Sequence, residues 1–164
     1  MTRVMTMAVL LVAASGLRAQ ETPSATRANG QVFRIGIGPS VAAAGGNVRK
    51  YSVMAVRTEG CSDAASASIT ATAEGLIGNE RKSVALVLTP AGPPGVYGVE
   101  GRWPSDGVWV LSFKGSCGAS QAGTVVPTRA GGFSREGAVF LTHAPTPGDV
   151  QESLKALAAA NSPK

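Results

Sequence analysis

Alternation of apolar and polar residues dominates the middle of the chain. Short runs alternate with a period of two, and Gly, Pro, Ser and Asp separate them. Successive side chains of a strand point to opposite faces, so each run is expected to be a half-buried strand. Many short strands of this kind favour an all-β fold, either a sandwich or a barrel. The expected strands cover residues 31–37, 51–57, 66–72, 83–89, 96–103, 108–113, 123–127 and 138–141.

The clearest local signal is the turn sequence Pro-Ser-Asp-Gly at residues 104–107. Proline presets its own φ, aspartate tolerates a turn, and glycine supplies a positive φ at the exit. The turn joins two runs of strand-forming residues, which predicts a β-hairpin. Large side chains share one face of each strand and, turned inward, would form much of the core: Tyr97 and Val99 on the first, Trp109, Leu111 and Phe113 on the second.

The C-terminal part has the pattern of a helix, expected from about Pro147 to Ala160 within the segment 146–160. Thr146 is placed as the N-cap, Pro147 as the first helical residue and Asp149 as an acid in the first turn, which resembles a capping box. The apolar residues that follow share one helical face, and they are Val150, Leu154, Leu157 and Ala158. The helix is expected either to pack on the sandwich or to reach a partner.

Residues 1–19 have the pattern of a secretory signal peptide. Arg3 precedes a short apolar run, and small residues follow it. The run is far shorter than the roughly 20 residues that a membrane-spanning helix needs. We expect cleavage after Ala19, with Gly16 as the alternative site and a buried N-terminal helix as the alternative structure. The protein is therefore expected in the periplasm or the medium, without stable membrane insertion after cleavage.

Removal of the signal peptide leaves one small domain with a mild positive charge. We expect a flexible lead-in over residues 20–30, the β-sandwich over 31–142 and then the helix. Loss of Arg3 and Arg18 lowers the formal net charge of +5 by two. The remaining basic residues are scattered, whereas nucleic-acid-binding proteins cluster them, so no nucleic-acid partner is expected.

Two cysteines remain in the mature chain, Cys61 and Cys117. In an oxidising compartment such a pair predicts one disulfide, which would close a long loop and stabilise the fold. The alternative is two free thiols whose Cα atoms lie too far apart to be bridged.

The sequence offers little for metal binding or catalysis. After cleavage the chain has one histidine, His143, and one methionine, Met54, too few for a copper-type site, so we expect no metal and no cofactor. The sequence Gly-Ala-Ser-Gln-Ala at 118–122 breaks the nucleophile-elbow pattern at its last position. His143 is the sole imidazole base, and we expect no enzyme.

Glycine, proline, aromatic and apolar residues before and after the turn at 104–107 form one pattern, made up of Gly95, Val96, Tyr97, Trp103, Pro104, Gly107, Trp109 and Leu111. With this pattern, the region around residues 50–127 resembles the exported YtkA-like and FixH-like domains. The resemblance implies that the chain is exported and that its all-β fold is an immunoglobulin-like antiparallel β-sandwich. Some relatives are associated with copper or with oxidase assembly, but the ligand-rich motifs for that role are absent from this sequence, so the role is not carried over.

The expected function is that of an exported, non-enzymatic interaction or accessory module of the cell envelope. It would bind an unknown envelope or extracellular protein through a sheet edge or through a surface at the expected hairpin turn, formed by Trp103, Pro104, Asp106 and Gly107. The first alternative is a module for a small ligand or glycan, which requires Trp103 to be exposed beside polar groups in a concave surface. The second alternative, a hydrolase, requires His143 within hydrogen-bond reach of a serine or a carboxylate.

Overall fold

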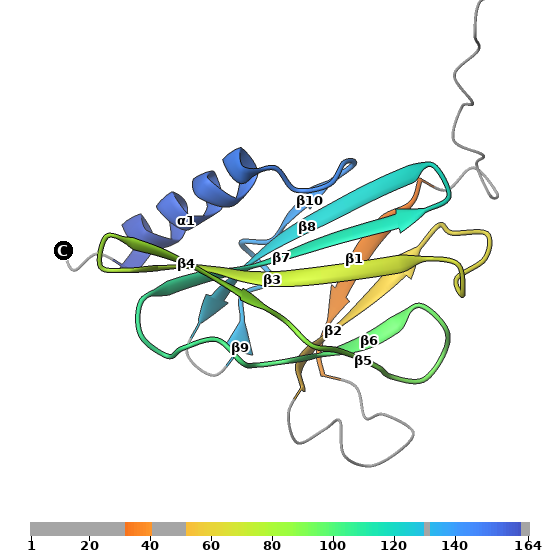
Figure 1. The fold of residues 1–164 in the computed structure, drawn as a ribbon, viewed down its shortest axis with the longest axis horizontal. Coiled ribbons are helices and arrows are strands. Elements are labelled where there is room, and N and C mark those ends of the chain that lie inside the picture. The colour runs from red at the N-terminus through yellow and green to blue at the C-terminus, as the bar shows by residue number, and fades with distance from the viewer. Residues whose placement is uncertain (1–31, 41–51, 130–131, 162–164) are drawn as a thin grey trace, which may run out of the picture.

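The computed structural model describes residues 32–40, 52–129 and 132–161, which fold into two antiparallel β-sheets and one helix (Figure 1). The four-stranded sheet has the order β1 (Arg34–Gly38), β2 (Ser52–Glu59), β6 (Val96–Glu100) and β5 (Leu88–Pro90). The six-stranded sheet has the order β10 (Val139–Leu141), β8 (Ser120–Arg129), β7 (Val108–Cys117), β3 (Ser68–Ile77) and β4 (Glu80–Ala85), and β9 (Gly132–Phe133) also pairs with β8. The predicted antiparallel β-sandwich is therefore confirmed. The expected signal peptide and lead-in, residues 1–30, lie outside the described residues.

The core lies between the two sheets and follows the alternation seen in the sequence. Each strand turns every second side chain inward, so the apolar set of each strand faces the opposite sheet. The largest side chains buried there are Ile35, Met54, Val56 and Val99 from the four-stranded sheet and Trp109, Leu111 and Phe113 from the six-stranded sheet.

The predicted hairpin between residues 96 and 113 is wrong. β6 pairs with β2 and β5 in one sheet, whereas β7 pairs with β3 and β8 in the other. The connecting residues 101–107 cross from one layer to the next. The turn chemistry correctly marks a reversal of the chain, but it does not specify which strands pair. Two strands with inward apolar faces can also bury them by lying in opposite layers.

The strand expected over residues 83–89 is divided between the two sheets. β4 ends at Ala85, and β5 begins at Leu88. Between them the Leu86 amide still donates to Ala71 O in the six-stranded sheet (3.0 Å), whereas Val87 O accepts from the Glu100 amide on the opposite side (3.2 Å). The alternation of apolar and polar residues continues through this change of sheet. It depends on which side chains face the core, and it does not depend on which strand pairs with the segment.

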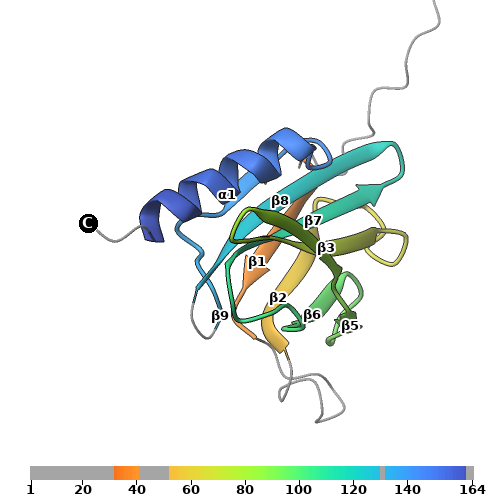
Figure 2. The ribbon, with the colours of Figure 1, turned by 60° about the vertical axis from the view of Figure 1, so that its left-hand side comes forward.

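The C-terminal helix is confirmed as α1 (Pro147–Asn161). Its first turn is capped reciprocally: the Asp149 amide donates to Thr146 Oγ1, and the Asp149 carboxylate accepts from the Thr146 amide at 2.8 Å and from its hydroxyl at 2.6 Å. The helix lies on the outer face of the six-stranded sheet (Figure 2). Its apolar face packs there against β7 and β8, with Val150, Leu154 and Leu157 contacting Val110 and Val125. Over the described ranges, no helix has both the length and the apolar character needed to cross a bilayer.

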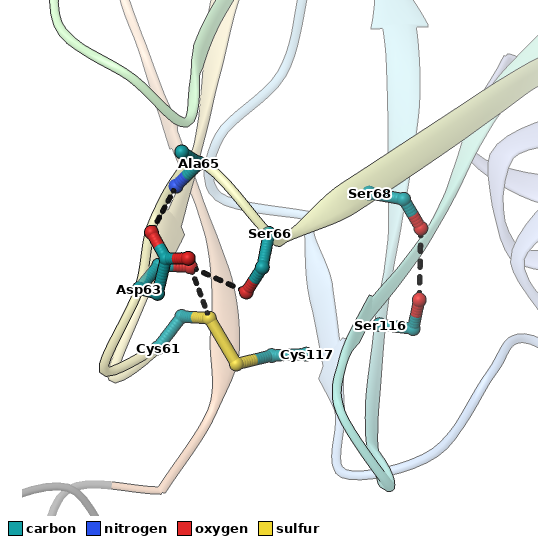
Figure 3. The surroundings of a disulfide bond; sticks show 7 residues. All are labelled: Cys61, Asp63, Ala65, Ser66, Ser68, Ser116 and Cys117. Atoms are coloured by element: carbon teal, nitrogen blue, oxygen red, sulfur yellow. Dashed lines mark hydrogen bonds between the residues drawn. A yellow bond between two sulfur atoms is a disulfide. The ribbon is translucent and has the colours of Figure 1, made fainter.

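The predicted disulfide between Cys61 and Cys117 is confirmed, and it joins the two sheets. Cys61 lies two residues after the end of β2, and Cys117 ends β7; their Cα atoms lie 5.9 Å apart. The turn after Cys61 is organised by Asp63, whose side chain accepts from the Ala65 amide and whose carbonyl accepts from Ser66 (Figure 3). Cys61 Sγ also lies 3.0 Å from that carbonyl, a close contact only, because a disulfide sulfur carries no proton.

Candidate functional site

An open groove of about 740 Å³ lies at one end of the sandwich, within the usual size range of ligand sites. Its apolar lining comes from four elements or connections: Val53 of β2, Trp103 from the β6–β7 connection, Val108 of β7 and Leu157 of α1. Its polar lining consists of hydroxyl, amide and guanidinium groups from Ser105, Thr128, Arg129, Ser134 and Asn161. We call this feature the Trp103 groove.

Trp103 is half-buried and lines this groove. Part of its ring packs against the core, and Gly101 lies beside its six-membered ring. A Cβ at Gly101 would come within 2.9 Å of Val53 Cγ1 and 3.8 Å of Trp103 Cη2, so the glycine allows both side chains to pack closely. The indole is therefore held in position while part of it remains accessible.

The floor of the groove is fixed by hydrogen bonds around Trp109. The indole Nε1–H of Trp109 donates to Asp106 O at 2.8 Å, and the Thr128 hydroxyl donates to Trp109 O at 2.9 Å. Gly107 has a φ of +82°, and a Cβ there would overlap Leu76 O, so the turn requires glycine. These contacts fix the backbone beside Trp103 and satisfy the polar groups beneath it.

The four residues of the expected surface occupy different places around the groove. Trp103, Pro104 and Gly107 line it, whereas Asp106 is exposed beside it and contributes its carbonyl to Trp109. The expected core aromatics lie inward: Trp109 is 2 % exposed, Phe113 is fully buried, and Tyr97 is half-buried against the core.

No sequence pattern marks the part of the groove lining that lies far from Trp103 along the chain. Thr128 and Arg129 end β8, Ser134 follows β9, and Asn161 ends α1. These residues are far from Trp103 in sequence, and they have no shared motif. The apolar periodicity of α1 placed Leu157 on the apolar face of the helix, but it did not show which part of the sheet Leu157 covers.

Arg129 differs from four other arginines of the fold in its pairing. Arg34 and Arg57 both contact the Glu59 carboxylate, and Arg102 contacts that of Glu100. Arg81 lies 3.9 Å from the Glu74 carboxylate. Arg129 is exposed, and no carboxylate of residues 32–40, 52–129 or 132–161 forms an ion pair with it. Of the groove-lining residues that the structure describes, it is the charged one.

Two carboxylates outside the groove have shifted pKa values. Burial raises the pKa of Glu59, but hydrogen bonds and charge from Arg57 and Arg34 outweigh it and lower the pKa overall. Hydrogen bonds from the Thr146 side chain and amide lower the pKa of Asp149. Both carboxylates stabilise local structure, the first between β1 and β2 and the second at the start of α1.

His143 lies on the exposed segment between β10 and α1. Its Nδ1 is 2.9 Å from Ala144 O. In the part of the chain that the structure describes, its ring makes no hydrogen bond to a serine or a carboxylate. The described segments also contain no group of three or more His, Cys, Asp or Glu residues placed to hold a metal ion.

Comparison of the chain with protein-family models, with curated proteins and with solved structures found no match. The geometry of the Trp103 groove is therefore the main indication of what the protein binds.

Proposed function

We propose that this protein is an exported, non-enzymatic binding module that holds its ligand in the Trp103 groove. The observation that carries the proposal is that half-buried Trp103 lines one groove together with hydroxyl, amide and guanidinium groups. An apolar or aromatic surface with a few convergent polar groups is the usual form of a ligand site. The groove thus favours the small-ligand or glycan module over a flat protein-binding face.

Two features support export. The first is the basic start and short apolar run of residues 1–19. The second is the Cys61–Cys117 disulfide, since such bonds persist mainly in oxidising compartments. We also propose a distant relationship to the exported YtkA-like and FixH-like immunoglobulin-like domains. It rests on the Gly-Val-Tyr and Trp-Pro-Ser-Asp-Gly-Val-Trp-Val-Leu sequences at 95–97 and 103–111.

A second candidate is an envelope interaction module that acts through the edge strand β10. Val139 is 43 % exposed and Phe140 54 % exposed on this strand. An edge strand offers unpaired backbone groups to a partner strand, and exposed apolar side chains add contact area. β10 has only three residues, however, which limits the pairing that it can offer.

Fluorine NMR separates the two candidates, because the chain has only two tryptophans. Protein labelled with 5-fluorotryptophan should give one resonance from Trp103 and one from Trp109, and Trp103→Phe assigns them. The probes are soluble neutral and acidic oligosaccharides and short peptides. Our proposal predicts that at least one probe shifts the Trp103 resonance and leaves that of buried Trp109 in place.

The contrary result is equally clear. In this result no probe shifts the Trp103 resonance, whereas a probe shifts the backbone amide resonance of Phe140 and Phe140→Ser abolishes its binding. The groove is then not the binding surface. The edge-strand module then replaces it.

A further inference from the structure

We infer that the ligand of the Trp103 groove is a carboxylated sugar, of the uronate or sialate class, whose carboxylate binds Arg129 while its ring lies on Trp103. The inference rests on the proposed function, because it names the ligand class of the same groove. It goes beyond that proposal by assigning an ionic contact and a stacking contact to two named residues.

The charge distribution argues for an acidic ligand. Arg129 is exposed at the groove and has no ion pair in the described ranges, whereas the guanidinium groups of Arg34, Arg57 and Arg102 are already bound to glutamates. A guanidinium presents donors in a planar fork that matches the two oxygens of a carboxylate. None of the groove-lining residues that can be described is acidic, so no carboxylate of the lining competes with the ligand.

The other groups of the groove suit a sugar ring. One face of a sugar ring is flat and carries partly positive C–H groups, which the negative face of an indole attracts. Trp103 exposes part of its indole in the groove. Ser105, Ser134 and Asn161 add hydroxyl and amide groups, which both donate and accept hydrogen bonds. Sugar hydroxyls need partners of both kinds.

An extended peptide fits the same surface less well. Peptides in sheet proteins are commonly held by main-chain pairing with an edge strand. At this groove the edge strand is β9, which has only two residues, Gly132 and Phe133. Most of the lining instead presents side chains, which favours recognition of a ligand through its ring and its substituents.

The test uses matched acidic and neutral probes with the mature protein. Sialyllactose and trigalacturonate are each compared with the same oligosaccharide after its carboxyl groups have been reduced to alcohols. Affinities are measured by calorimetry, and binding is located by the Trp103 fluorine resonance. In at least one pair the acidic member should bind roughly tenfold to a hundredfold more tightly, the range for hydrogen bonds to a charged group.

Two variants isolate the Arg129 contact. Arg129→Gln should remove the preference for the acidic probe, and Arg129→Lys should restore only part of it, since an ammonium lacks the planar fork. Lys114→Gln is the matched control, because Lys114 is an exposed cation on β7 that lies outside the groove lining. It removes the same charge and should leave the preference intact. Circular dichroism verifies that each variant is folded.

Three results would overturn the inference. The first is equal binding of the acidic and neutral members with a shift of Trp103, which rejects the carboxylate but keeps the proposed function. The second is an acidic preference that survives Arg129→Gln, which rejects the assigned contact. The third is no binding of any of these sugars at millimolar concentration, which rejects the ligand class. In the third case, a peptide probe that shifts the Trp103 fluorine resonance would keep the groove as the binding site. If no peptide probe shifts that resonance either, both proposals are rejected.

Discussion

The six-membered ring of Trp109 lies against Gly75, its cross-strand partner on β3. A Cβ built at Gly75 would overlap Cε3 of that ring. The indole is the largest fully buried side chain of the core. Its ring occupies the space that a Cβ at position 75 would fill. The floor of the Trp103 groove thus depends on a glycine in the neighbouring strand.

Gly75→Ala is therefore expected to destabilise the protein by about 1–3 kcal/mol, the usual cost of overpacking a core. Urea unfolding measures the change. Gly38→Ala is the matched control, because Gly38 also lies on a strand but a Cβ there meets no atom within 4 Å. Equal stability of the two variants would contradict the packing that we describe.

Loss of the disulfide should cost more. Cys61 and Cys117 are separated by 56 positions, and closing a loop of that length stabilises the folded state by about 4 kcal/mol in the chain-entropy model. The double variant Cys61→Ser/Cys117→Ser should lower the free energy of unfolding by an amount of this order. The control is Ser68→Ala/Ser116→Ala, which removes an exposed hydroxyl–hydroxyl contact of 2.8 Å between β3 and β7. A loss in the cysteine variant no larger than in the control would refute a stabilising role for the bond.

Export can be tested by the mass of the protein recovered from the envelope or the medium. The expected mass lacks residues 1–19, or 1–16 if cleavage follows Gly16. Two alkylations of Cys61 and Cys117 should occur only after reduction, since both sulfurs are in the disulfide. An intact N-terminus together with two freely alkylated thiols would rule out the proposed compartment.

The start of α1 should weaken in acid. The folded-state pKa of Asp149 lies below its ordinary value of 3.8, mainly because Thr146 donates hydrogen bonds to the carboxylate. A lowered pKa stabilises the fold above the unfolded-state pKa, and this contribution disappears as the pH falls through the folded-state value. Asp149→Asn should thus be less stable than the wild type at about pH 7, and the difference should be smaller at about pH 3, below the ordinary pKa of 3.8.

Thermal unfolding followed at the helical band of circular dichroism measures this difference. Glu152→Gln is the control on the same helix, because the Glu152 side chain makes no hydrogen bond in the described ranges. Its stability should stay close to that of the wild type at both pH values. A difference for Asp149→Asn that is no smaller in acid would show that the cap does not depend on the carboxylate charge.

Burial along the strands could be predicted from the sequence, whereas strand pairing could not. Ala71 and Leu86 are buried as their alternating patterns predict, because alternation depends only on the extended backbone. Leu88 lies in the opposite sheet from Ala85, although both belong to one alternating run. The assignment of a strand to a sheet depends on competition among all strands for partners, and a local pattern does not contain that information.

Only the part of the groove lining around Trp103 could be predicted from the sequence. Trp103 precedes a recognisable turn, so its place near the surface could be argued from adjacent residues. Arg129 and Leu157 reach the same groove because β8 ends there and because α1 docks on the outer face of the sheet. Both depend on tertiary packing between distant segments, which leaves no signal in the spacing of single residues.

The sandwich is covalently closed at one end only. β7 is a ten-residue strand, so its two ends, Val108 beside Trp103 and Cys117 in the disulfide, lie about 30 Å apart. Strand separation near Cys117 must strain a covalent bond, whereas separation near Val108 breaks only noncovalent contacts. Amide protons of β7 should consequently exchange faster toward Val108 than toward Ser116. The two layers can therefore fray at the Trp103 end while the opposite end keeps them in register.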